Sequence, residues 1–127
     1  MKQTSFKIPI YDIEVNLVKI ERQSDANLID NVLRQEDIPL DLVREITDNT
    51  ANSVEGAITL FDKGKKRAFI VFYKSDNKAH LMRSLCHEKR HLEDDVVALC
   101  NINKDDEAVA YLAGYLGELF FNFLLMK

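Results

Sequence analysis

The hydrophobic pattern of this 127-residue chain changes its period at about residue 77, and that change limits the folds open to it. Residues 57–73 contain two apolar runs rich in β-branched and aromatic residues, AITLF and AFIVFY, on either side of a polar turn at residues 62–65. This pattern is typical of a β-hairpin. Beyond it the apolar residues recur at helical spacing on one broad face, at Leu81, Leu85, Leu92, Val96 and Leu99. The sequence therefore predicts a hairpin that leads into one long helix over residues 77–100.

The N-terminal half carries weaker signals of the same two kinds. Alternating apolar residues predict one long strand or two short strands, with Phe6, Ile8, Ile10, Ile13, Val15 and Leu17 at the apolar positions. Ser24 is the predicted N-cap of a helix whose apolar positions are Leu28, Ile29, Val32 and Leu33. Pro39 and the apolar residues after it predict a second, short helix, and the polar residues 48–53 predict a loop.

The C-terminal quarter predicts one more helix. Residues 101–104 break the long helix, and Asp105 or Asp106 can cap a final helix that runs to near the C-terminus. Strands and helices then follow one another without an internal repeat or a linker. We expect a single α+β domain over residues 1–127, with a small antiparallel or mixed sheet packed on the 77–100 helix and on the C-terminal helix.

The composition argues against two classes of partner. Hydrophobic residues make up 46% of the chain and charged residues 30%, as in ordinary soluble domains. The net charge of −4 does not suit nucleic acid or an anionic membrane surface, because both attract a positive footprint. The N-terminus lacks the uninterrupted apolar stretch of a signal peptide. We therefore expect neither nucleic acid nor a membrane as a partner.

The two cysteines predict the compartment. If one helix carries both Cys86 and Cys100, they lie about 21 Å apart along it, which is beyond the reach of a disulfide. Two unpaired thiols suit a reducing compartment, so we expect the protein in the cytoplasm.

The C-terminal residues 108–126 are apolar enough to suggest a membrane span as well as a core helix. Glu118 and Asn122 interrupt the segment, Gly114 and Gly117 lower its helix strength, and no basic flank orients it. We expect a buried core helix. Its last residues, FFNFLLM, could pack against a second copy and form a homodimer.

Residues 87–91 match the pattern H-E-x-x-H and fall inside the predicted long helix. One helical turn separates His87 from His91, so both imidazoles project from the same face and can hold one Zn²⁺ ion. Glu88 is offset around the helix, where it can accept a proton from a water molecule on the metal instead of binding the ion. The alternative is a solvated helix face with two surface histidines.

A catalytic zinc ion needs a third protein ligand, and the start of the last helix is acidic. If that helix folds back on the first one, it brings Glu107 toward the two histidines, with Asp106 as the competing ligand. The alternative for Glu107 is a helix N-terminal carboxylate that interacts with the helix dipole. Tyr111 lies four residues after Glu107 on the same face, and it or Tyr115 could donate a hydrogen bond to a developing oxyanion or belong to the core.

The segments HEKRHLEDD and DDEAVAYLAGYL together resemble the gluzincin branch of the zincin metallopeptidases, over roughly residues 75–117. They are also similar to small phage and mobile-element proteins in which an H-E-x-x-H precedes a D-E-A-x-A-Y-L-x-G-Y-like helix. The resemblance implies a minimal zincin-like domain with His87, His91 and Glu107 as zinc ligands and Glu88 as the general base. It also implies that the strand at residues 68–73 holds an extended substrate at a sheet edge.

Some residues depart from the gluzincin pattern. Lys89 and Arg90 occupy positions that are normally uncharged, and Glu93 occupies one that is usually apolar. Ala110 stands where an acid or a serine often orients a ligand histidine. A carboxylate for that purpose would have to come from elsewhere, with Asp94, Asp95 and Asp106 as the candidates.

Two functions follow from these residues. The first is a zinc-dependent metallopeptidase that hydrolyses a peptide bond in a peptide or protein substrate, with Glu88 and Tyr111 as catalytic residues. The second is a non-catalytic metal-binding or protein-interaction module of phage or mobile-element origin on the same scaffold. The departures from the gluzincin pattern favour the second function slightly.

Overall fold

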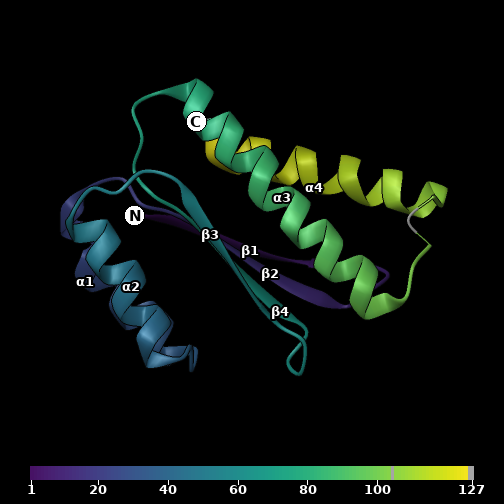
Figure 1. The fold of residues 1–127 in the computed structure, drawn as a ribbon, viewed down its shortest axis with the longest axis horizontal. Helices are drawn as coiled ribbons and strands as arrows, with labels where there is room; N and C mark the ends of the chain where they lie inside the picture. Colours follow the sequence, from purple (N-terminus) through teal and green to yellow (C-terminus); the bar gives the residue numbers. More distant parts are fainter. Residues whose placement is uncertain (104, 126–127) are drawn as a thin grey trace.

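The computed structural model describes residues 1–103 and 105–125, which form three layers (Figure 1). A four-stranded sheet lies in the middle. Helices α1 (Ala26–Gln35) and α2 (Leu40–Ala51) cover one of its faces, and helices α3 (Lys78–Cys100) and α4 (Glu107–Leu125) cover the other. The predicted α+β class is confirmed.

The sheet is mixed, with the strand order β1-β2-β4-β3. Strands β1 (Lys2–Ile8) and β2 (Ile13–Lys19) pair antiparallel, as do β3 (Ala57–Asp62) and β4 (Arg67–Phe72). Strands β2 and β4 join the two hairpins in parallel. The N-terminal residues therefore form two short strands, the predicted hairpin over residues 57–73 is confirmed, and β3 lies at a free edge of the sheet.

Two predictions for the α1–α2 layer were wrong. Ser24 does not cap α1, because it lies inside a short 3₁₀ helix (Gln23–Asp25), and the Asp25 carboxylate instead accepts backbone hydrogen bonds from the two residues before that helix. Helix α2 runs to Ala51, so the loop predicted over residues 48–53 is confined to residues 52 and 53. Thr50 explains this difference, since it is 2% exposed, continues the buried stripe of Val43 and Ile46, and donates its hydroxyl hydrogen bond to the Ile46 carbonyl.

The long helix α3 begins and ends at residues suited to those places. The Asn77 side chain accepts hydrogen bonds from the backbone N–H groups of Ala79 and His80, which is the usual role of an N-cap. Asn101 ends the helix in the left-handed conformation, with φ of 53°. Helix α4 then runs back along α3 and over β1 and β2 (Figure 1).

The sheet separates two hydrophobic cores. Strands β2 and β4 supply both, because their successive side chains point to opposite faces. The larger core joins the sheet to α3 and α4 and includes Val15, Leu17, Ile70, Phe72, Leu85, Leu92, Leu116 and Phe120. The smaller core joins the sheet to α1 and α2 and includes Val18, Ile20, Val71, Ile29, Leu33, Val43 and Ile46.

Helix α4 is only partly the buried core helix that its composition predicts. Five of its residues are buried, namely Leu112, Leu116, Phe120, Phe123 and Leu124. Within residues 1–103 and 105–125 it is the one helix long and apolar enough to cross a membrane, and 28% of its most apolar 18-residue stretch is buried. The cytoplasmic location and the homodimer through this helix stay predictions.

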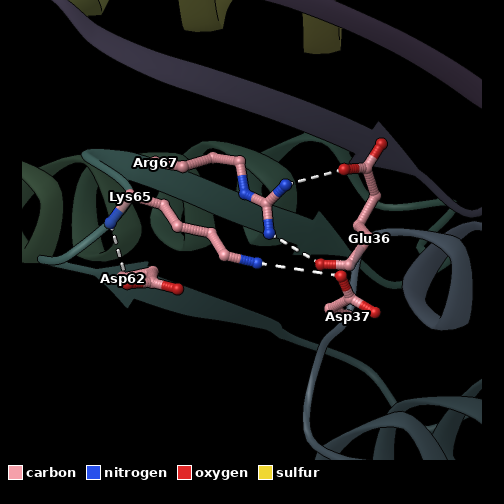
Figure 2. Close-up of polar contacts among 5 residues, drawn as sticks. All are labelled: Glu36, Asp37, Asp62, Lys65 and Arg67. Carbon is pink, nitrogen blue, oxygen red and sulfur yellow. Dashed lines mark hydrogen bonds and ion pairs between the residues drawn. The ribbon is translucent and has the colours of Figure 1, made fainter.

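A group of ion pairs ties the β3–β4 turn to the corner between α1 and α2 (Figure 2). The Arg67 guanidinium donates to the Glu36 carboxylate and to the Glu36 carbonyl, at 2.7 Å in both cases. Lys65 reaches Asp37 at 3.9 Å, and the Lys65 backbone N–H donates to the Asp62 carboxylate at 3.1 Å. These contacts hold the turn, and with it the edge strand β3, against the rest of the domain.

Candidate metal site

The two histidines of the H-E-x-x-H motif converge on one point. His87 and His91 lie one turn apart on α3, and their Nε2 atoms are 3.0 Å from each other. The rings meet edge to face, with 4.6 Å between centroids. Two nitrogens bound to one tetrahedral zinc ion at about 2.0–2.1 Å would lie roughly 3.3 Å apart, so only a small adjustment separates this pair from a chelating one.

Glu88 completes a group of three that could hold a metal ion. One ligand atom from each of His87, Glu88 and His91 lies within 4.8 Å of the other two. Both imidazoles are exposed, whereas Glu88 is 4% exposed. The predicted histidine pair is therefore assembled within one helix and is open to solvent on one side.

The Glu88 carboxyl group is held in a poorly solvated place between α3 and β3. Burial raises its pKa, while the neighbouring imidazoles of His87 and His91 and a hydrogen bond from Thr59 act in the opposite direction. The Thr59 hydroxyl donates that bond to Glu88 Oε2 at 3.4 Å. A carboxylate with a raised pKa binds a proton more readily, which suits a general base.

The structure does not bring Glu107 to the two histidines. A Cβ atom added to Gly117 would lie 3.9 Å from Lys89 Cδ, so the part of α4 beside the motif is ten residues beyond Glu107, or about 15 Å along the helix. Lys89 also lies two positions from each histidine, which places it about 160° away from them around α3. Helix α4 therefore packs on the flank of α3 opposite the imidazoles.

The other acidic candidate at the start of α4 is also explained by local structure. Asp106 precedes the first residue of the helix, and its carboxylate accepts a hydrogen bond from the Ala108 backbone N–H at 3.4 Å. That contact is the capping role that the sequence predicts. The antiparallel return of the last helix is thus correct, but its direction places both acids away from the cluster.

Tyr111 and Tyr115 lie on the side of the molecule away from the cluster. Tyr111 is 73% exposed and lines an apolar groove of about 320 Å³ between α4 and the β1–β2 turn. The Tyr115 hydroxyl donates to the Lys7 carbonyl at 3.4 Å, and its ring packs against Phe6. Neither phenol faces Glu88, so the structure does not place the predicted oxyanion donors at the cluster.

The charged residues inside and after the motif are paired with each other. The Lys89 ammonium donates to the Glu93 carboxylate, which is one turn further along α3 and 4% exposed. Arg90 forms an exposed pair with Asp94 at 3.4 Å. Two of the departures from the gluzincin pattern, at positions 89 and 93, therefore compensate each other in the α3–α4 contact and do not disturb the histidines.

Asp94 and Asp95 both lie on the flank of α3 that carries the imidazoles, but Asp94 pairs with Arg90, which leaves Asp95 as the candidate supporting acid there. It lies one turn after His91 and is half-buried. Burial raises the pKa of its carboxyl group, the nearby His91 imidazole lowers it, Asp94 raises it and Lys63 lowers it. Its place favours a contact with His91, whereas Asp94 is engaged with Arg90 and Asp106 with the α4 cap.

A groove of about 380 Å³ extends from the cluster along the first half of α3. Its helix wall carries His80, Arg83, Ser84 and His87, and its opposite wall carries Glu55, Gly56 and Ala57 at the start of the edge strand. Arg83 is a residue of this groove that was not predicted from the sequence. The signal was present, because residues 80, 83, 84 and 87 share one face of a helix.

Comparison with known proteins found no family model, no curated protein and no solved structure that matches this chain. The likeness to gluzincins and to phage and mobile-element proteins therefore stays a prediction. The geometry of the cluster and its surroundings are what bear on function.

Proposed function

We propose that this chain is a zinc-dependent peptidase whose metal ion is held by His87 and His91. The observation that carries the proposal is the 3.0 Å approach of the two Nε2 atoms beside a buried carboxylate. Imidazole nitrogens with a neighbouring carboxylate form a donor set that suits zinc. The exposed side of the cluster leaves coordination positions open, as a catalytic zinc site requires.

Glu88 is the general base in this proposal. Zinc, when bound, would polarise the scissile carbonyl and make an attacking water more acidic. The Glu88 carboxylate accepts the proton of that water and passes it to the leaving amine. Burial of the Glu88 carboxyl group supports this role because it raises the pKa of that group, and the hydrogen bond from Thr59 limits its movement.

The free edge of β3 is the surface that suits an extended peptide. The Tyr73 N–H donates to the Gly56 carbonyl at 2.9 Å, which fixes the alternation of the β3–β4 ladder. Ala57, Thr59 and Phe61 consequently direct their backbone N–H and C=O groups away from β4. A chain paired with them would pass beside Glu88, because Thr59 contacts that carboxylate.

The sequence predicted that a substrate would pair with β4, whereas the free edge belongs to β3. Strand β4 is interior, with β2 on one side and β3 on the other, so its backbone groups are already paired. The prediction that residues 68–73 hold a substrate is therefore wrong. The strand before it in the chain has the free edge.

The position of Glu107 favours a second function. Without a carboxylate from α4, the cluster offers two imidazoles and Glu88 among residues 1–103 and 105–125. If Glu88 binds the ion, it is no longer free as a base, and the cluster would serve as a metal-binding module without peptidase activity. The two functions differ in what Glu88 does.

Elemental analysis and one pair of variants test both functions. The purified protein should contain about one zinc ion per chain, and His91→Ala should lose it. Under the peptidase proposal, Glu88→Gln should retain zinc and lose hydrolysis of a mixed peptide library by a factor of at least about 100. Loss of zinc in Glu88→Gln would favour the binding module instead, and a wild-type chain without stoichiometric zinc would rule out both.

A further inference from the structure

Arg83 is a cationic side chain on the helix wall of the groove that extends from the candidate metal ligands. It lies one turn before His87 and lines the same groove as His87 and Glu88. Arg83 is exposed, and among residues 1–103 and 105–125 no carboxylate lies within 4.0 Å of its guanidinium. The guanidinium is therefore available to a ligand.

The acid on the opposite wall is already engaged. The Glu55 carboxylate lies 3.5 Å from Nδ1 of His80. His80 lies one helical turn further from the cluster than Arg83. The groove thus has an acid–histidine pair at its far end and an unpaired arginine between that pair and the metal ligands. A planar guanidinium binds carboxylates through two parallel hydrogen bonds, which gives it selectivity for that group.

The spacing relates Arg83 to the reacting bond. One helical turn is about 5.4 Å, and an extended chain advances about 3.3 Å per residue. A peptide paired with the β3 edge, and with its scissile bond at the His87–His91 cluster, therefore presents at Arg83 a residue that lies within about two positions of that bond.

We propose that Arg83 binds a carboxylate of the substrate, so that the site selects peptides with an acidic group within two residues of the cleaved bond. The inference depends on the proposed peptidase function and specifies its substrate class. The carboxylate can belong to an Asp or Glu side chain or to the end of the peptide chain. Arg83 is a specificity-determining residue and takes no part in the proton transfer.

Matched peptides distinguish the two sources. The first series exchanges Glu for Gln at each of the two positions on either side of a cleaved bond, with both chain ends blocked. The second series keeps these positions neutral and compares free with amidated C-termini. The wild type should prefer the acidic member of one series by about tenfold or more in kcat/KM, since a charged hydrogen bond is worth at least that factor.

Three variants assign the preference to Arg83. Arg83→Gln should bring the ratio of acidic to neutral peptide to about one, and Arg83→Glu should reverse it toward peptides with lysine. Arg44→Gln, an exposed change of the same charge on α2, should keep the wild-type ratio. A preference unchanged in Arg83→Gln, or a wild type without any preference, would overturn the inference and leave the peptidase proposal intact.

A binding measurement supplies a readout that does not depend on turnover. Zinc-loaded Glu88→Gln protein should bind a fluorescent Glu-containing peptide about tenfold more tightly than its Gln counterpart, and the double variant Glu88→Gln/Arg83→Gln should bind both equally. Equal binding of both peptides to the single variant would contradict the inference. Failure of the wild type to bind zinc or to cleave any peptide would overturn the peptidase proposal, and the inference with it.

Discussion

The Glu88 carboxyl group is almost fully removed from solvent by α3 and β3. Burial raises its pKa, although the two imidazoles and the Thr59 hydroxyl lower it in part. A carboxyl group whose pKa is higher in the folded chain than in the unfolded chain binds its proton more tightly in the folded state. Its ionised form therefore destabilises the fold, from about pH 4.3 upward and fully above the raised pKa.

Glu88→Gln should consequently stabilise the metal-free protein near neutral pH. In the presence of a chelator at pH 8 we expect a gain of roughly 1 kcal/mol, or about 4 °C in Tm, and we expect the gain to shrink as the pH falls toward 4. Thermal melts at both pH values measure it. Glu118→Gln, an exposed change on α4, is the control and should show no such pH dependence. An equal gain at both pH values would mean that ionisation of Glu88 is not the cause.

Glu107→Gln should leave zinc affinity unchanged within about twofold, because the carboxylate starts a helix that packs on the other flank of α3. His91→Ala removes one of the two converging nitrogens and should abolish stoichiometric zinc. Titration with a competing zinc indicator measures both. A large loss of affinity in Glu107→Gln would show that α4 reaches the metal and would restore the ligand set predicted from the sequence.

The contrast between His91 and Glu107 shows which part of the site could be predicted from the sequence. The two histidines share a helix, so their meeting depends only on the helical repeat, which the sequence pattern reveals. The third ligand depends on where a second helix packs. That packing places Gly117 beside Lys89 and buries Leu116 and Phe120 against the sheet, and none of these neighbours has a local signal in the sequence.

At the scale of elements, the contact between the hairpin and the α1–α2 corner controls the edge strand. Arg67 starts β4, its side chain is 12% exposed, and both of its hydrogen bonds to Glu36 are 2.7 Å long. The Phe69 ring lies 5.1 Å from the guanidinium carbon. A largely buried charge of this kind is costly to leave without its partner.

Arg67→Met should therefore destabilise the protein by about 1–3 kcal/mol, because it removes two charge-assisted hydrogen bonds while keeping most of the apolar stem. Lys65→Met removes only an exposed pair at 3.9 Å and should cost less than about 0.5 kcal/mol. Urea denaturation of both variants measures the difference. Equal stabilities would show that the hairpin is held by its apolar contacts alone.

The elements themselves were largely predictable, and the errors concern neighbours in space. The hairpin and α3 have strong periodic patterns, so their types and approximate bounds follow from the sequence. The edge position of β3 depends on the parallel pairing of β4 with β2, which lies about fifty residues earlier in the chain. Helix α2 continues because Thr50 is buried, and its polar side chain conceals that burial in the sequence.

At the scale of the whole molecule, the two cores are formed without the metal site. The larger core lies between the sheet and the α3–α4 layer, and the smaller one lies behind the sheet, under α1 and α2. His87 and His91 are exposed and belong to neither core. Metal binding at the candidate site would therefore add to a fold whose cores are already complete, unlike in small domains whose few core residues need a metal to fold.

Removal of zinc should accordingly lower the Tm and leave the fold intact. Zinc at 100 times its dissociation constant would stabilise the folded state by about 2.7 kcal/mol, provided that the unfolded chain does not bind it, which corresponds to roughly 10 °C for a domain of this size. After chelation we expect the far-ultraviolet circular dichroism at 25 °C to be unchanged and the melt to stay cooperative. His91→Ala should melt at the Tm of the chelated wild type whether or not zinc is added. Helix α3 packs into the larger core through Leu85 and Leu92, so its helical signal should survive chelation. Loss of that signal would mean that α3 needs the ion to form.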